Sequence, residues 1–584
     1  MCRKALVVAL LACACGSTTE GTRLSRDAGA ESPTDAAIHE IDSGAPTIHA
    51  EDMADPLFDR DHLVSIEIEL APHDWDALRS QTRTLESTLA RAECLAAPFE
   101  SPFTYFKAQV RIDGERFEHV GVRKKGFLGS LSETRPSLKI KLDEYLPGLE
   151  FLGLSSLTLN NGQQDPTLIK PCLGYDVFRR AGLPAPRCNY AEVIVNGESL
   201  GPYVNLQTVN KPFLRSHFVE DEGQLYEGTL SDFRDEWLGT FEQKTNEDTP
   251  YDRADLEGLT RALDAPDARL FESLEPWVDL DQFYRFWVVE SLIAHWDGYA
   301  GNTNNFFVYR HPVNGKFRFI PWGADGIFDS RDVAPTSVLA EGYLARRLYL
   351  HPQGRQRYVA TFESILDEIW DADQMRAEID RAARVIAPAV PAAAIQPLHD
   401  ATERLRGFVT ARERQLRAEL DLGGAEWTNP ARDPLCFDFA SLSAHIQTRF
   451  GTHPAPDIFR TGTGTFTATV GAQRIEGLIV GSSAGIGVEP NDLGRVVLLQ
   501  ASTTADGSIP VVYVVMDPQK LASGLVPIDG ESVAGALLRI PRPGAELEVV
   551  GFFWQGWIEI RTGSATPDAP IDVSVHAQLL SQRR

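Results

Sequence analysis

Residues 295–309 read H-W-D-G-Y-A-G-N-T-N-N-F-F-V-Y, and residues 317–329 read F-R-F-I-P-W-G-A-D-G-I-F-D. A helix is predicted before this stretch, because Asp279 is a favourable N-cap and the apolar positions after it keep helical spacing. Between the two halves, Asn314-Gly315 predicts a hairpin turn. The pattern therefore predicts a buried helix, an Asn-rich loop, and a hairpin that brings a second acidic residue back to the loop.

Two acidic residues and an asparagine make this stretch a candidate site for phosphoryl transfer. Asp297 and Asn302 have the spacing D-x-x-x-x-N of a protein-kinase catalytic loop, with His295 in the place of the loop's leading His. This chemistry uses a carboxylate that orients or deprotonates the acceptor hydroxyl, and ligands for the metal. Asp325, before a glycine, is in the place of the metal-binding Asp of a D-F-G turn. The spacing alone occurs about once by chance in such a chain, and the alternative is a set of Asx-turns above a solvent-facing hairpin.

An upstream basic cluster supplies candidate phosphate ligands. Residues 121–130 read G-V-R-K-K-G-F-L-G-S, and residues 135–142 read R-P-S-L-K-I-K-L. The residues expected to contact phosphate are Arg123, Lys125, Gly126 and Lys139. Cationic side chains pair with phosphate oxygens, and glycine lets the backbone approach them. The alternative is a solvated strand edge protected by lysines, but the acidic residues downstream favour a phosphate site.

The composition limits the class of protein. The chain has 584 residues, which is enough for roughly two to four domains. Its 43% hydrophobic residues exclude wholesale disorder. No run of about 20 apolar residues occurs, so no membrane-spanning helix is predicted. A formal net charge of -26 argues against a nucleic-acid binder, so any polyanion must meet a local basic cluster.

The N-terminus resembles a bacterial lipoprotein signal peptide, predicted over residues 1–15. Two basic residues precede an apolar run at 5–12, which is too short to span a bilayer but fits a secretory signal. The run leads into Leu-Leu-Ala-Cys at Cys13, a lipobox in which the cysteine is lipidated. Cys15 is the rival site, and an ordinary signal peptide without lipid is the alternative. Residues 16–55 are predicted to be a disordered tether, so we expect an exported envelope lipoprotein, periplasmic or surface-facing, that meets the membrane only through its lipid anchor.

Four cysteines remain outside the signal region. They are Cys94, Cys172, Cys188 and Cys436. An even number in an exported protein permits two disulfides, with three possible connectivities. Cys172 and Cys188 are the favoured pair because they lie close in sequence. No C-x-x-C or H-E-x-x-H motif occurs, so nothing indicates a zinc site.

The order of predicted elements divides the chain into two folded regions. Strand patterns dominate residues 57–145 and predict an antiparallel sheet. Helices and strands then mix as far as residue 420, which makes residues 56–425 an α+β domain. The helices expected in it lie at about 165–181, after Asp279, at 355–386 and at 398–420.

Residues 426–584 are predicted to form a small all-β, sandwich-like domain. Gly423-Gly424 and nearby prolines mark the linker before it. Short β-rich runs with frequent turns follow. Trp554 and Trp557 could form a sugar-stacking platform, but an offset of three puts them on opposite faces of a regular strand. We therefore expect both to be mostly core residues.

The ordered set of motifs between about residues 60 and 420 is similar to the spore-coat CotH kinase family. The motifs, in order, are R-x-K-G, P-S-L-K-I-K-L-D-E-Y, L-T-L-N-N-G-Q-Q-D-P-T, V-N-G-E-S-L-G-P-Y, H-W-D-G-Y-A-G-N-T-N-N-F-F-V-Y and P-W-G-A-D-G-I-F. The resemblance implies an atypical secreted kinase-like fold that binds ATP with Mg²⁺ or Mn²⁺ and phosphorylates Ser or Thr of an exported protein whose identity is unknown. By position, Asp297 would be the catalytic residue, Asn302 and Asp325 the metal ligands, and Lys139 the phosphate lysine.

The chain departs from the family pattern at three positions. The family often has Glu at the position of Gln207, here expected in the cofactor site, an acid at Gly323, and a non-proline residue at Pro171. Gln keeps hydrogen bonding but loses the charge of Glu. These departures support the alternative function, a catalytically inactive kinase-like module for surface binding or assembly.

Overall fold

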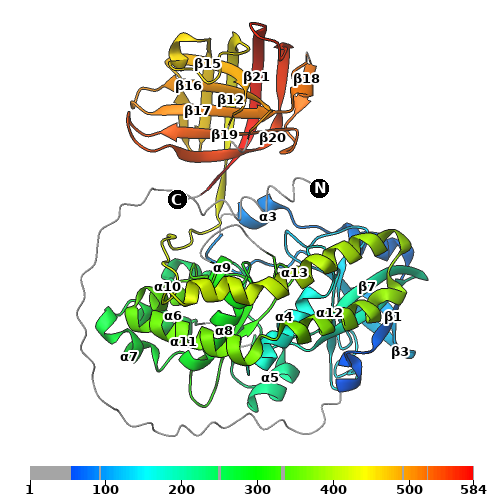
Figure 1. Cartoon of the computed structure of the whole chain (residues 1–584). Helices are drawn as coiled ribbons and strands as arrows, with labels where there is room; N and C mark the ends of the chain where they lie inside the picture. The colour runs from blue at the N-terminus through cyan, green and yellow to red at the C-terminus, as the bar shows by residue number, and fades with distance from the viewer. Residues whose placement is uncertain are drawn as a thin grey trace. The chain divides into compact units, whose positions relative to one another are not determined.

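The computed structural model describes residues 54–90, 94–247, 252–329, 336–488, 492–522 and 524–582. The protein is a mixed α+β protein, as the sequence predicts (Figure 1). Its chain forms two compact units. Within the described part, the first contains residues up to 83 and 95–433, and the second contains 84–94 and the residues from 434 onward. The predicted signal peptide and tether, with Cys13 and Cys15, lie outside the described residues.

A closed β-barrel forms one half of the first unit (Figure 1). Its strands, in barrel order, are β1 (Leu63–Glu69), β2 (Phe106–Ile112), β3 (Glu115–Lys125), β4 (Ser137–Lys141), β5 (Ser156–Asn160), β7 (Glu198–Gln207) and β6 (Cys188–Val195). The antiparallel sheet expected over residues 57–145 is confirmed, because β1 pairs with β2, β2 with β3 and β3 with β4 in antiparallel. The strand β6, which lies beyond that range, pairs with β1 in parallel and closes the barrel. Alternate side chains of each strand, such as Val64, Ile66 and Ile68 of β1, are buried inside it.

The other half of the first unit is mainly helical around a small sheet. Its strands, in sheet order, are β11 (Phe317–Pro321), β10 (Phe306–Arg310), β8 (Gln224–Gly228) and β9 (Glu242–Gln243). The helices of the unit are α2 (Pro72–Ser80), α4 (Lys170–Arg180), α5 (Lys211–Phe218), α6 (Ala254–Leu263), α7 (Leu270–Leu274), α8 (Leu280–Leu292), α9 (Tyr299–Asn302), α10 (Tyr343–Leu350), α11 (Pro352–Ile369), α12 (Ala372–Ile386) and α13 (Ile395–Leu420). The helix α8 is buried among aromatic rings and leads directly into the loop that holds Asp297.

Capping residues explain where several helices begin. As predicted, Asp279 caps α8 and accepts a hydrogen bond from the backbone N–H of Gln282 at 3.2 Å. The helix expected at 165–181 starts later, at Lys170, because Asp165 accepts hydrogen bonds from the backbone N–H groups of Thr167 and Lys170. Pro171 lies in the first turn of α4, where its missing N–H has no helical partner to lose.

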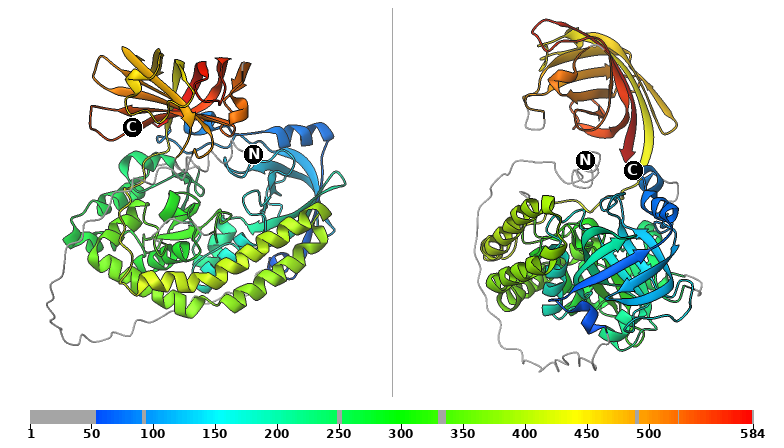
Figure 2. Two further views of the ribbon diagram at one scale, coloured as in Figure 1. Left: turned by 45° about the horizontal axis from the view of Figure 1, so that its top comes forward. Right: turned by 90° about the vertical axis from the view of Figure 1, so that its right-hand side faces the viewer.

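The predicted helical stretch at 355–386 is two helices. Asp371 ends the first by capping the second, accepting hydrogen bonds from the backbone N–H groups of Asp373 at 3.0 Å and Gln374 at 2.9 Å. The helices α12 and α13 lie side by side in Figure 2. In the described part of the chain, no helix is long and apolar enough to cross a membrane.

The second unit is built on one ten-stranded sheet. Its strands are β12 (Phe437–Arg449), β13 (Thr463–Val470), β14 (Gln473–Glu476), β15 (Ile479–Ile486), β16 (Val496–Thr503), β17 (Ile509–Met516), β18 (Gly524–Pro527), β19 (Val533–Ile540), β20 (Glu548–Thr562) and β21 (Pro570–Gln582), and α3 (Leu85–Leu89) belongs to the same unit. The sheet is continuous rather than split into the two sheets of a sandwich. Phe450, just after β12, bridges to Ala484 of β15, which brings distant strands of the same sheet together.

Two features of this unit, the exposure of Trp557 and the disulfide of Cys94, were not predicted from the sequence. Trp557 is 50% exposed, so the expectation that it belongs to the core is wrong. A β-bulge in β20 next to Trp554 breaks the strict alternation on which that expectation relied. Cys94 forms a disulfide with Cys436 across 342 positions of sequence, a pairing that no local pattern indicates.

Candidate active site

Asp297 lies at the centre of a hydrogen-bonded loop between α8 and β10. Its carboxylate accepts hydrogen bonds from the side-chain amides of Asn302 at 2.5 Å, Asn304 at 3.2 Å and Asn305 at 2.8 Å. Burial raises the pKa of Asp297, and the amide hydrogen bonds act in the opposite direction. The predicted Asx-rich loop therefore exists, and its asparagines all orient one carboxylate.

A buried glutamate that the sequence reading missed supports this loop. The carboxylate of Glu290, in the last turns of α8, accepts hydrogen bonds from the backbone N–H groups of Tyr299 at 2.9 Å and Ala300 at 2.8 Å. Burial raises the pKa of Glu290 to about 8. A Cβ at Gly298 would lie 2.1 Å from Glu290 Oε1, so this approach requires glycine. The available signal was an acidic residue inside an otherwise apolar run, V-V-E-S-L.

His295 joins the loop to the turn after β11. Its ring is fully buried, and Nε2 lies 3.2 Å from the carbonyl oxygen of Trp322. Burial lowers the pKa of His295 to about 4, so the ring is neutral at physiological pH. The histidine is therefore a structural link between the segment of Asp297 and that of Asp325.

Asn302 and Asp325 each present a buried oxygen without a hydrogen-bond partner. Within the described residues, neither Asn302 Oδ1 nor Asp325 Oδ1 receives a donor. Burial raises the pKa of Asp325 to about 6, although Lys125 opposes the shift, and nearby Asp165 and Asp297 add to it. Amide and carboxylate oxygens are the ligands that Mg²⁺ and Mn²⁺ prefer, so this pair fits such an ion. In the described chain no group of three or more His, Cys, Asp or Glu side chains could hold a metal.

Gly323 is glycine for a steric reason rather than as a lost carboxylate. Its φ is +50°, and a Cβ there would lie 2.2 Å from Asn305 Oδ1. Asn305 is one of the three amides that hold Asp297. The interpretation of Gly323 as a missing acid is therefore wrong for this chain, because no side chain fits there without moving Asn305.

We expect Gly323→Ala to disturb the site, although the substitution adds only one methyl group. The methyl group displaces Asn305, and the left-handed backbone adds strain of roughly 1 to 3 kcal/mol. Thermal unfolding should show a lowered melting temperature. Gly407→Ala is the matched control, since a Cβ at Gly407 meets no atom within 4 Å and the residue lies in the helix α13. Equal melting temperatures for the wild type and the Gly323 variant would contradict the steric explanation.

A cationic pocket of about 450 Å³ lies between barrel strands and the small sheet. Its charged lining residues are Arg123, Lys125, Lys139, Lys141, Lys244, Glu227 and Glu247. Five cations against two acids is the reverse of the balance in the whole chain, which has 56 Lys and Arg against 82 Asp and Glu. Such a pocket favours a polyanion.

Two lysines in the pocket are held in unusual environments. Burial lowers the pKa of Lys125 and of Lys139 to about 8 each, and neighbouring cations contribute to both shifts. Lys125 Nζ donates a hydrogen bond to Asn160 Oδ1 at 2.5 Å and lies 5.6 Å from the ring centre of Trp322. The side chain of Lys139 makes no hydrogen bond or ion pair with the described residues. An anion in the pocket would relieve this concentration of positive charge.

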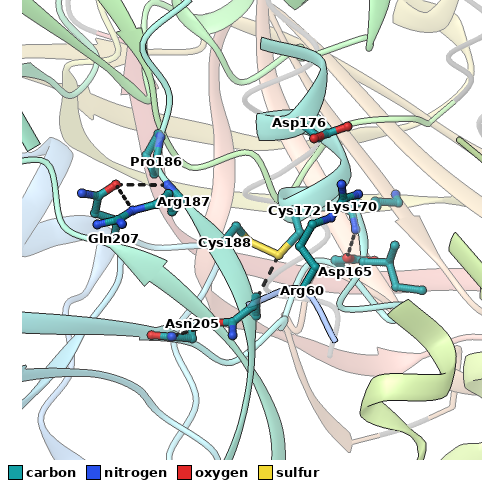
Figure 3. The surroundings of a disulfide bond; sticks show 12 residues. Arg60, Asp165, Lys170, Cys172, Asp176, Pro186, Arg187, Cys188, Asn205 and Gln207 are labelled. Atoms are coloured by element: carbon teal, nitrogen blue, oxygen red, sulfur yellow. Dashed lines mark hydrogen bonds between the residues drawn. A yellow bond between two sulfur atoms is a disulfide. The ribbon is translucent and has the colours of Figure 1, made fainter. Parts of the chain in front are cut away.

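The structure brings together three of the five residues predicted for the cofactor site. Arg123, Lys125 and Lys139 line the pocket, but Gly126 and Gln207 do not. Gln207 Oε1 accepts a hydrogen bond from Arg187 Nε at 3.2 Å (Figure 3). This hydrogen bond accounts for an amide side chain at position 207. Gly126 has a φ of +124° in the turn after β3, where its role is conformational.

The sequence reading also missed acidic and basic partners in the pocket. Glu227, on β8, pairs with Lys244 at 3.0 Å, and the positive charge of Lys244 contributes to a lowered pKa of Glu227. Glu227 in β8 and Lys244 just after β9 both lie far from the basic cluster in sequence. No local spacing relates them to Lys139, so only the fold identifies them.

Cys172 and Cys188 form a disulfide (Figure 3). It is the pair that the sequence favours, and it joins α4 to β6. In the same helix, the side chain of Lys170 pairs with Asp329 at 2.7 Å, four residues after Asp325. A Cβ at Gly174 would lie 2.4 Å from Ile327, so α4 packs directly against the turn that carries Asp325.

The family model described as CotH kinase protein matches residues 122–416. The inner spore coat protein H of Bacillus subtilis (strain 168) is 24% identical over 39% of this chain and 67% of that protein. The invasin CotH7 of Rhizopus delemar is 24% identical over 39% of this chain and 41% of that protein, so the chain spans less than half of this relative.

A solved structure from Shewanella oneidensis MR-1, a HipA and HipB toxin–antitoxin complex with operator DNA, is also similar. It is 8% identical over 51% of this chain and 66% of that chain, with a TM-score of 0.24. This similarity is too low to carry an argument. The family match covers half of the sequence and includes the loop that holds Asp297 and the turn that holds Asp325. The chain therefore belongs to the CotH kinase protein family.

Proposed function

We propose that the protein is an atypical protein kinase that transfers the γ-phosphate of ATP to Ser or Thr of an exported protein. The observation that carries the proposal is the pair of unpartnered oxygens on Asn302 and Asp325 beside the oriented carboxylate of Asp297. The cationic pocket adds the means to hold a triphosphate. Buried acceptors without a donor cost stability, and a bound metal ion would offset that cost at this site.

Each residue has a distinct role in the proposed reaction. The carboxylate of Asp297 accepts the proton of the acceptor hydroxyl as the hydroxyl oxygen bonds to the γ-phosphorus. The bond from the γ-phosphorus to the β–γ bridging oxygen breaks, and ADP leaves with the electron pair. Asn302 and Asp325 would hold Mg²⁺ or Mn²⁺, which neutralises phosphate charge when bound. Lys125 and Lys139 would hold the phosphates.

The names of the relatives support an extracellular or surface location. One is an inner spore coat protein and another an invasin. Two disulfides in the described chain are consistent with an oxidising compartment. We infer that the acceptor is an exported protein, and the lipid anchor at Cys13 stays a prediction.

The two buried lysines give nucleotide binding a characteristic pH dependence. Their pKa values of about 8 lie below that of an exposed lysine, so they lose their charge as the pH rises above about 8. Affinity for ATP should therefore fall at least about tenfold between pH 7.5 and pH 9.5, because a charged lysine binds phosphate better than a neutral one.

Calorimetric titration of the full chain with ATP and Mg²⁺ or Mn²⁺ measures this dependence. Lys316→Ala is a control for general charge loss, since Lys316 pairs with Glu275 and does not line the pocket. The absence of ATP binding at pH 7.5 with either metal would contradict the proposed function. Constant affinity up to pH 9.5 would contradict the role of the buried lysines.

A further inference from the structure

The segment that follows α13 is fastened to the first unit. We call residues 425–433 the strap. Its backbone carbonyls accept three hydrogen bonds: Ala425 from Tyr349 Oη at 2.7 Å, Asn429 from the Arg346 guanidinium, and Arg432 from Arg234 Nη2 at 2.6 Å. The strap therefore does not behave as the free linker that Gly423-Gly424 and the nearby prolines predict.

Arg432 is the charged residue of the strap that enters the protein interior, where the strap residue Trp427 is also buried. The residue is 5% exposed, and its Nη1 pairs with Glu341 Oε2 at 3.1 Å. Its other two nitrogens, Nε and Nη2, have no hydrogen-bond partner among the described residues. Burying a guanidinium with unsatisfied donors is costly. Packing alone does not explain an arginine at this position.

Both groups that hold Arg432 also hold residues 296–305, which we call the catalytic loop. The backbone N–H of Glu341 donates to the carbonyl of Ala300 at 2.8 Å. Arg234, which holds the Arg432 carbonyl, pairs with Asp232 at 3.0 Å, and Asp232 accepts a hydrogen bond from Tyr299 Oη at 3.2 Å. Two short routes therefore connect the strap to the backbone between Asp297 and Asn302.

The catalytic loop lacks a positive charge of its own. Residues 296–305 read W-D-G-Y-A-G-N-T-N-N, without Lys or Arg. Phosphoryl transfer generally uses cations close to the transferred group. The charge of Arg432 reaches Asp297, where it opposes the effect of burial on the pKa. In the same way, the charge of Lys125 opposes the effect of burial on the pKa of Asp325.

We propose that Arg432 is a positioning residue of the active site, which holds the catalytic loop through Glu341 and supplies the positive charge that the loop lacks. The proposal rests on the proposed kinase function for its effect on the reaction. The strap lies beyond residue 416, where the family match ends. The matched region alone would then be an incomplete catalytic unit.

The test compares Arg432→Ala, Arg432→Lys and Arg404→Ala in the full chain. Arg404 is an exposed residue of α13 that has no partner among the described residues, so its loss is a control for the charge change. For Arg432→Ala, kcat should fall about ten- to a hundredfold, the range that loss of a supporting partner costs. The KM for ATP should stay within about twofold, because the pocket lysines are unchanged. Arg432→Lys should recover part of kcat by keeping the charge.

Hydrogen exchange of the backbone amides at 298–304 provides a second readout that does not depend on activity. These amides should exchange faster in Arg432→Ala than in the wild type, and Arg404→Ala should match the wild type. Unchanged exchange in folded Arg432→Ala, or unchanged kcat, would overturn the proposal. A wild type that binds no ATP defeats the proposed function instead, and the exchange measurement then still decides whether Arg432 positions the loop.

Discussion

The Asp297→Asn variant should bind ATP and metal as the wild type does and should lose phosphate transfer. The amide has nearly the shape of the carboxylate, but it cannot accept the proton of the acceptor hydroxyl. Loss of a general base typically costs about 10²- to 10⁴-fold in rate, so kcat should fall by that factor. Phosphate incorporation from labelled ATP measures the loss, and calorimetry measures the retained binding.

Asp281→Asn is the matched control for Asp297→Asn. The Asp281→Asn substitution makes the same chemical change on α8, at a side chain that is 90% exposed. Its kcat should equal that of the wild type. If Asp297→Asn transferred phosphate at the wild-type rate, Asp297 could not be the residue that handles the proton. If it also lost ATP binding, Asp297 would belong to the nucleotide site.

The Asp325→Ala variant should fail at an earlier step, the metal-dependent binding of ATP. Removal of this carboxylate leaves Asn302 as the remaining proposed metal ligand and takes from Lys125 one of its acidic neighbours, Glu227 being the other. Even supporting partners of metal ligands contribute about 10- to 100-fold in metal affinity, so the loss of a direct ligand should be at least that large. Titration of ATP at several Mn²⁺ concentrations measures the effect, and high Mn²⁺ should restore it only in part.

The difference between the two variants tests the assigned roles more strictly than either variant alone. Asp297→Asn should separate transfer from binding, whereas Asp325→Ala should lower both. Equal metal dependence in the wild type and in Asp325→Ala would show that the metal, if one is needed, is held elsewhere. The exposed Asp281 again provides the reference for any unspecific effect of lost charge.

The sequence predicted the parts of the site that are local. The D-x-x-x-x-N spacing, the hairpin that returns Asp325 and the cap at Asp279 depend on residues within a few turns of one another. Proximity in sequence likewise favoured the Cys172 pairing that the structure contains. These features depend on turn and capping chemistry, which short patterns carry.

The features that the sequence did not predict depend on distant contacts. The barrel closes through the parallel pairing of β1 and β6, and Cys94 reaches Cys436 across most of the chain. Glu227 enters the pocket from β8, and no spacing connects it with the basic cluster. The steric reason for glycine at position 323 was also not predicted, because only the fold places Asn305 next to Gly323.

Transfer of labelled γ-phosphate from ATP tests the central claim most directly. The full wild-type chain is incubated with ATP and Mg²⁺ or Mn²⁺ near pH 7.5, with a Ser- and Thr-containing protein such as casein as acceptor, and phosphoamino acids are then identified. We predict metal-dependent label on Ser or Thr, either in the acceptor or in the chain itself, and none with Asp297→Asn. A wild type that binds ATP but places no label on Ser or Thr with either metal would contradict the kinase proposal.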